Sequence, residues 1–141
     1  MTLQRPPEPE HVGSFTLHGP MAAEISNAVV KLFREHFGKG PTQAKTIIAE
    51  ETVVAVLRGG FTQAEKTLYR AGRADVVEEG RRAMQDVFQR EMRMAVERIT
   101  GRRVEAFLSA NHHEPDASVE VFLLDGPPAA KGAPADAAPP A

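Results

Sequence analysis

The stretch TVVAVLRGGFTQAEKTLYRAG, residues 52–72, decides the fold because a strand, a turn and a helix follow one another within it. Residues 52–58 are rich in β-branched side chains and predict a strand. Residues 62–65 have the spacing of a capping box, in which a Thr hydroxyl and a Glu carboxylate bond the free amides at a helix start. We therefore expect a short helix over Gln63–Arg70 that stops at Gly72.

The predicted strand is apolar at nearly every position and not only at alternate ones. Val53–Leu57 is the longest uninterrupted apolar run in the chain. Such a run indicates an interior strand that is covered on both faces. In a small domain the second cover is either another layer or a partner chain, and on this ground we expect a homo-oligomer, specifically a homodimer.

The segments before residue 52 predict a helix and a second strand. Apolar side chains recur at helical spacing over Pro20–Phe37 and form one face: Met21, Ile25, Ala28, Val29, Leu32, Phe33 and His36. Ala44–Ala49 predicts a strand because of its β-branched residues. Glu50 and Glu51 would form the turn between the two strands, although tight hairpins prefer Gly or Asn there.

The segments after residue 72 predict a long helix and two strands. Asp75, with Glu78 three positions later, repeats the capping pattern and predicts a helix over Val76–Thr100. We expect this helix to bury an apolar stripe: Val77, Ala83, Met84, Val87, Phe88, Met92, Ala95 and Ile99. Alternating side chains then predict strands over Arg103–Ala110 and Ser118–Leu124.

Together these elements predict a two-layer α+β fold, in which helices pack on a four-stranded antiparallel sheet in the order α-β-β-α-α-β-β. Residues 21–125 would form this single domain. We expect a flexible arm over residues 1–20, with a short extended piece at Phe15–Leu17. The Ala/Pro-rich residues 126–141 predict a disordered tail.

The composition of the 141-residue chain excludes several classes of function. The absence of cysteine excludes disulfides, thiolate metal sites and a cysteine nucleophile, and it fits the reducing cytoplasm. The chain has 17 basic and 19 acidic residues, so it lacks the basic field that is typical of nucleic-acid-binding proteins. A membrane-spanning helix needs about 20 apolar residues, far more than any run here, so we expect no transmembrane segment.

The first of two glycine turns is Phe37-Gly38-Lys39-Gly40-Pro41. It could hold a phosphate or a protein partner, with Lys39 as the charge. A phosphate loop precedes a helix, however, whereas this turn follows one and meets the negative end of the helix dipole. A helix cap followed by a turn is therefore the favoured interpretation.

The second glycine turn, residues 58–62 (RGGFT), precedes a helix start, where anions are attracted. An anion could bind there beside Arg58 and Lys66, and Lys39 could join them if the two turns meet. Thr62 and Glu65 already have a structural role in the capping box, so capping is again the favoured interpretation.

Two further groups of polar residues have ordinary surface explanations. One arginine cluster, interleaved with acids, predicts a solvated, salt-bridged surface, although it could meet phosphate or an acidic partner: Arg70, Arg73, Arg81 and Arg82. The loop Asn111–Asp116 contains two histidines and two acids. Metal ligands usually come from separate elements, so we expect a polar loop and no metal site.

Taken in order, the motifs resemble the MpsC family, the C component of the sodium-translocating membrane-potential-generating system. The resemblance covers about residues 21–125 and rests on the first glycine turn, on residues 53–68 (VVAVLRGGFTQAEKTL), and on Gly101–Val104 followed by Phe107–Ser109. The residues that match the family pattern are Gly38, Lys39, Gly40, Pro41, Arg58, Gly59, Thr62, Glu65 and Lys66, whereas Gly60 and the Ala/Pro-rich tail are less typical. The resemblance implies a small, soluble bacterial protein that is associated with membrane components for cation transport and inorganic-carbon uptake, and it supplies no catalytic residues.

The resemblance and the lack of a catalytic constellation lead us to expect a non-enzymatic, cytoplasmic accessory or regulatory protein at the inner face of the membrane. It would bind membrane transport subunits without a cofactor. Candidate binding residues are the matching ones above together with Gly60, Arg81 and Arg82. One alternative is an anion-binding module that holds a phosphate or nucleotide at the glycine turns. A further alternative is an RNA-binding domain that uses the Arg98–Arg103 face, against which the near-neutral charge argues.

Overall fold

The computed structural model describes residues 19–129 and confirms the predicted α+β fold. Its elements, in chain order, are α1 (Gly19–Phe37), β1 (Gln43–Ala49), β2 (Thr52–Arg58), α2 (Gln63–Arg70), α3 (Ala74–Thr100), β3 (Val104–His112) and β4 (Ala117–Leu124). The order is the predicted α-β-β-α-α-β-β. The expected arm, including Phe15–Leu17, and most of the expected tail fall on residues 1–18 and 130–141, which lie outside the described residues.

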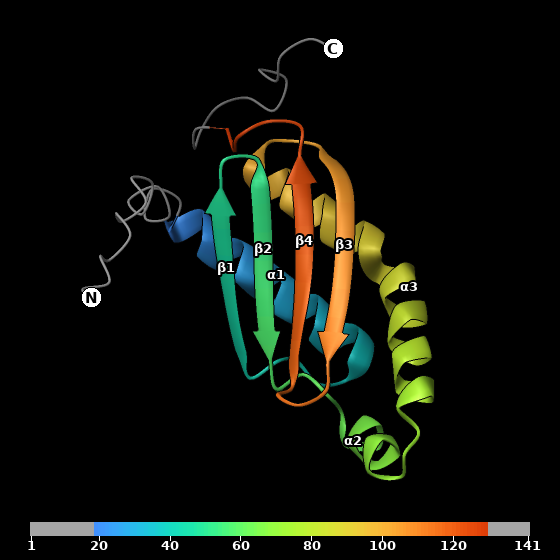
Figure 1. Cartoon of the computed structure of the whole chain (residues 1–141). Helices are drawn as coiled ribbons and strands as arrows, with labels where there is room; N and C mark the ends of the chain where they lie inside the picture. Colours follow the sequence, from blue (N-terminus) through green and yellow to red (C-terminus); the bar gives the residue numbers. More distant parts are fainter. Residues whose placement is uncertain (1–18, 130–141) are drawn as a thin grey trace, which may run out of the picture.

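The strands form one antiparallel sheet in the order β1-β2-β4-β3 (Figure 1). β2 and β4 are therefore the central strands, which agrees with the apolar sequence of β2. Glu50 and Glu51 form the predicted turn, because Ala49 pairs with Thr52 across it. Glu50 adopts a left-handed backbone conformation in this turn, with a φ of 52°.

The helices cover only one face of the sheet. In Figure 1, α1 and α3 pass behind the strands and contact each other, whereas α2 lies beyond the strand ends. Along β2, Val53, Ala55 and Leu57 are buried beneath the helices, and Val54 and Val56 are half-buried on the other face. The sequence left open whether a second layer or a partner chain covers this other face. Among residues 19–129, no second layer does.

Aromatic and branched side chains of the helices and the central strands share one core. Phe33 of α1 meets Phe88 of α3 edge to face, with their ring centroids 5.3 Å apart. Both belong to the same buried cluster as Val53 of β2 and Phe122 of β4. Burying a side chain of this size stabilises the fold by about 1.5–3 kcal/mol. The core therefore ties the two helices to the centre of the sheet.

The buried stripe of α3 differs from the predicted one. Its covered residues are Val77, Arg81, Gln85, Phe88, Met92, Val96 and Thr100. The predicted residues Ala83 and Val87 are exposed, Val87 by 71%. The prediction followed apolar side chains only, whereas the helix turns Arg81 and Gln85 inward because each finds a polar partner there.

The two ends of α3 show one wrong prediction and one confirmed one. The helix begins at Ala74, with Arg73 at the cap position and no side-chain cap, so the predicted capping role of Asp75 is wrong. Asp75 instead accepts a hydrogen bond from Nε of Arg73 at 3.4 Å. Gly101 ends the helix as predicted, with a φ of 70°. Beyond β4, the N–H of Ala129 donates to the Thr100 carbonyl at 2.8 Å, so residues 126–129 pack against the domain.

No helix within residues 19–129 combines the length and the apolar character that crossing a membrane requires.

Candidate functional site

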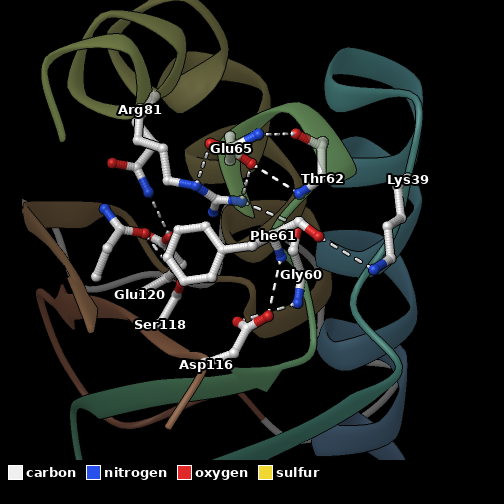
Figure 2. Close-up of polar contacts among 11 residues, drawn as sticks. Lys39, Gly60, Phe61, Thr62, Glu65, Arg81, Asp116, Ser118 and Glu120 are labelled. Carbon is white, nitrogen blue, oxygen red and sulfur yellow. Dashed lines mark hydrogen bonds and ion pairs between the residues drawn. The ribbon is translucent and has the colours of Figure 1, made fainter. Parts of the chain in front are cut away.

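Arg81 of α3 lies at the centre of a polar cluster beneath the second glycine turn, with only 1% of its surface exposed. Its Nε donates to Oε2 of Glu65 at 2.7 Å and its Nη2 donates to Oε1 at 2.8 Å (Figure 2). Nη2 also donates to the carbonyl oxygen of Gly60 at 2.9 Å. We call the following residues the turn cluster: Lys39, Gly60, Phe61, Thr62, Glu65, Arg81 and Asp116.

Two aromatic rings enclose the guanidinium group. Cζ of Arg81 lies 4.1 Å from the ring centroid of Phe61 and 4.7 Å from that of Phe37. The electron-rich ring faces attract the cation and keep water away from it. In the Arg81–Glu65 ion pair Arg81 is therefore buried and Glu65 is half-buried. Losing either partner would leave the other charge without its counter-charge.

Glu65 joins this ion pair to the start of α2. Its Oε1 accepts the N–H of Thr62 at 2.9 Å, and the Thr62 hydroxyl accepts the N–H of Glu65 at 3.2 Å, so the predicted capping box is confirmed. Burial by itself would raise the pKa of Glu65. Hydrogen bonds from Arg81 and Thr62, together with the charge of Arg81, outweigh burial and lower this pKa below its ordinary value. Glu65 is therefore ionised at neutral pH.

The second glycine turn does bind an anion, and that anion belongs to this chain. The N–H groups of Gly60 and Phe61 donate to the two carboxylate oxygens of Asp116, at 3.2 and 3.1 Å (Figure 2). Gly59 permits the turn, because its φ is 70° and a Cβ atom there would lie 2.2 Å from Oγ1 of Thr42. Asp116 thus occupies the amides at which the sequence suggested an external anion.

Lys39 connects the first glycine turn to the second. Its Nζ donates to the carbonyl oxygen of Phe61 at 3.1 Å (Figure 2). Gly38 follows α1 with a φ of 77°, in agreement with the predicted helix cap. Pro41 is buried and lies beside Gly60, where an added Cβ atom would come within 3.8 Å of its Cγ. The two turns, predicted as separate motifs, therefore form one unit.

The structure brings some candidate residues together and separates others. Lys39, Gly60, Thr62, Glu65 and Arg81 all belong to the turn cluster, and the half-buried Gly40 lies against α1. Alternation along β2 places Arg58 on the face away from the helices. Lys66 and Arg82 are exposed on α2 and α3. The expectation that Arg81 belongs to a solvated surface is wrong, because Glu65, Gly60 and the rings replace its water.

Glu120 of β4 forms a second buried polar contact, which the sequence analysis missed. Its side chain is completely buried, and its Oε1 accepts a hydrogen bond from Nε2 of Gln85 at 3.1 Å. Burial raises the pKa of Glu120 to about 8, despite hydrogen bonds from Ser109 and Gln85 and the charge of Arg81. The group is therefore mostly protonated at neutral pH. Its alternation with Phe122 and Leu124 could have indicated the buried face.

The loop with the histidines packs beside the turn cluster. The ring of His113 stacks on Tyr69 of α2 with the centroids 3.6 Å apart, and Tyr69 meets Phe61 edge to face. Among residues 19–129, no group of three or more His, Cys, Asp or Glu side chains could hold a metal ion. Apart from Asp116, which anchors the turn, the loop contributes packing.

A polar cleft of about 520 Å³ lies between α3 and β3. Arg82 and Gln85 line it from the helix, and Ser109 lines it from the strand. Its volume is within the range of small-ligand sites. The turn cluster has a different character, because its charged groups contact opposite charges or backbone dipoles of the same chain. Its chemistry is that of a clamp that fixes both glycine turns against α2 and α3.

Comparisons with known proteins agree with this arrangement of motifs. The family model described as "Na+-translocating membrane potential-generating system (MpsC)" matches residues 18–126. The chain is also similar to "Uncharacterized protein YrhF" of Bacillus subtilis (strain 168), with 28% identity over 104 residues, which cover 72% of this chain and 85% of that protein. No solved structure matches the chain.

Proposed function

This chain belongs to the MpsC family of the Na+-translocating membrane potential-generating system, and from that membership we propose that it is a non-enzymatic accessory or regulatory protein of a membrane transport system. The system would carry a cation or inorganic carbon. The protein would lie in the cytoplasm at the inner face of the membrane and act through contacts with the transport subunits. The description of the family supports the link to a sodium-translocating membrane system.

The observation that carries this proposal is the uncovered face of the sheet. Half-buried or exposed apolar side chains project from all four strands on this face, among them Ile47, Val54, Leu108 and Val121. A contiguous apolar surface of this kind marks a site of protein contact. It supports a function through protein–protein interaction, and we further propose that the chain is a homodimer.

The contacts of the turn cluster favour this proposal over an external anion site. Asp116 already bonds the amides of Gly60 and Phe61, and Glu65 already pairs with Arg81. An external phosphate would have to displace a carboxylate from each position. We therefore expect phosphate, nucleotides and bicarbonate to leave the melting temperature unchanged, whereas a ligand of the native state would raise it.

Affinity capture of the native protein from gently solubilised membranes tests the accessory role. We expect ion-transport subunits to be recovered with it. The control is the variant V87K, which should recover the same subunits as the native chain. Val87 is 71% exposed on α3 and remote from the open sheet face. Recovery of ribosomes or RNA in place of transport subunits would contradict the proposal and favour the RNA-binding alternative.

A further inference from the structure

The open sheet face, which the helices leave uncovered, is a regular apolar grid. The strand register aligns its side chains in rows across the sheet. The central row is wholly apolar and consists of Ile47, Val54, Val121 and Leu108. The row toward the β1–β2 hairpin contains Ala49, Thr52, Leu123 and Ala106, and the row on the other side contains Lys45, Val56, Val119 and Ala110. Lys45 is thus the only charged residue of these three rows.

The size of this face is close to what a small specific interface needs. Strands lie about 4.8 Å apart and same-face residues about 6.8 Å apart, so three rows on four strands cover roughly 400 Å² of plane. Two copies would cover roughly twice that area. Side-chain relief adds to the accessible surface, which brings the total near the ~1,000 Å² that a specific interface requires. An interface at this lower bound is typical of weak or transient association.

Charges at the two ends of the β1–β2 hairpin are complementary to each other. Lys45 and the exposed Arg58 lie toward one end of the β1–β2 pair. Glu50 and Glu51, both exposed, form the turn at the opposite end. A hairpin with opposite charges at its two ends matches an inverted copy of itself. This pattern favours a second copy of the chain over a partner of another kind.

We propose that two copies of the chain pack sheet against sheet through the open face, related by a two-fold axis that runs along the row Ile47–Val54–Val121–Leu108. This inference rests on the proposed homodimer and adds its surface and its orientation. Each strand then lies over its own counterpart in the opposite direction. Lys45 and Arg58 of one copy approach the partner's Glu50–Glu51 turn. An axis along the strands would instead place the basic ends over each other.

Thiol cross-linking of the full chain tests the orientation, because the chain has no cysteine of its own. In the proposed dimer, position 45 of one copy faces position 49 of the other. The double variant K45C/A49C should therefore give a covalent dimer with a short bismaleimide. The variant K45C/A110C reports the rejected axis and should remain monomeric. The reverse ranking of the two variants would overturn the proposed orientation.

A lysine in the central row tests the surface. Leu108 is 55% exposed, so L108K leaves the isolated fold intact, whereas in the dimer two lysines would face each other in an apolar row. We expect the dissociation constant, measured by sedimentation equilibrium, to rise at least about tenfold. The control V87K should leave it unchanged. Circular dichroism of both variants verifies that each is folded.

The outcomes separate this inference from the proposed function. A native chain that stays monomeric at about 100 μM would overturn the dimer, while recovery of transport subunits from membranes would still support the accessory role. A dimer that L108K leaves unchanged would overturn the assignment to the open sheet face alone. Dissociation promoted by salt is expected, because the end charges are exposed and screened.

Discussion

Each of the two faces of the sheet departs from the distribution of polarity that is usual in a folded protein. Beneath α1 and α3 lie fully buried polar groups, including Arg81, Gln85 and Glu120. The open sheet face, by contrast, has the apolar row through Val54 and Val121. Polar groups are mostly exposed in folded proteins, and a large exposed apolar area is the informative exception.

The difference shows that the burial of a residue does not by itself say whether its face of the sheet still needs a partner. Each charged group in the turn cluster has a partner within the chain, although Oε2 of Glu120 is buried on the same face without a hydrogen-bond partner in the described part of the chain. The apolar groups of the open sheet face lack such a cover among residues 19–129. We therefore expect changes on the covered face to alter folding stability, and changes on the open sheet face to alter association.

Replacing Arg81 with alanine should give the largest loss of stability. The change removes the positive charge beside the Glu65 carboxylate, which keeps only the Thr62 N–H as a donor within residues 19–129, and it removes the side-chain donor of the buried Gly60 carbonyl. We expect a loss of about 3–5 kcal/mol in the free energy of unfolding, measured by urea denaturation. The neighbouring R82A is the control, because Arg82 is exposed, and it should cost less than about 0.5 kcal/mol. Equal effects of the two substitutions would contradict the internal role of Arg81.

The pKa of Glu120 predicts an unusual dependence of stability on pH. Because burial raises this pKa from 4.5 to about 8, the folded state binds a proton more tightly than the unfolded chain. The resulting stabilisation is fully present below about pH 4.5 and is lost as the pH rises through 8. The free energy of unfolding should thus fall by up to about 1.4 kcal/mol per pH unit in this window.

The substitution E120Q should remove this fall, because glutamine stays neutral and can still accept from Gln85. At pH 8 the variant should be more stable than the native chain by a few kcal/mol. Glu65 has the opposite shift, so its stabilisation is lost as the pH falls through its lowered pKa, and both proteins should share that acid limb. Urea denaturation across pH 3–9 would measure both limbs. A native-like slope in E120Q would exclude Glu120 as the cause.

The two left-handed glycines of the turns should differ in their tolerance of alanine. G59A combines an unfavourable φ of 70° with a contact of 2.2 Å to Oγ1 of Thr42, and should cost about 2–3 kcal/mol. G38A meets no atom within 4 Å and should cost only about 1 kcal/mol for its φ of 77°. Thermal or urea denaturation would rank them. A cost for G38A as large as that for G59A would show that φ, and not the close approach, determines both.

Local sequence signals predicted much of the fold. Thr62 and Glu65 define a helix start within four residues, and Gly101 marks a helix end in the same way. The contacts that the sequence did not predict join residues that lie far apart along the chain. Arg81 of α3 can be buried because it pairs with Glu65 of α2. Asp116 accepts a hydrogen bond from Phe61, which lies 55 residues away along the chain. No local spacing encodes these pairs, since the sheet register and the path of α3 create them.

The smallest predicted effect lies at the β1–β2 turn, where one substitution should raise folding stability and weaken association. Glu50 has a φ of 52°, a conformation that costs about 1–2 kcal/mol and that glycine adopts without strain. Glycine loses more entropy on folding, so E50G should raise the free energy of unfolding by only about 0.5–1 kcal/mol. The same change removes a charge that would face Lys45 and Arg58 of the second copy, so association should weaken at low salt. Glu51 is the matched control, because it is not among the residues with a positive φ. E51Q should therefore weaken association without the gain in stability. If E50G gains stability and associates as the native chain does, Glu50 does not belong to the interface.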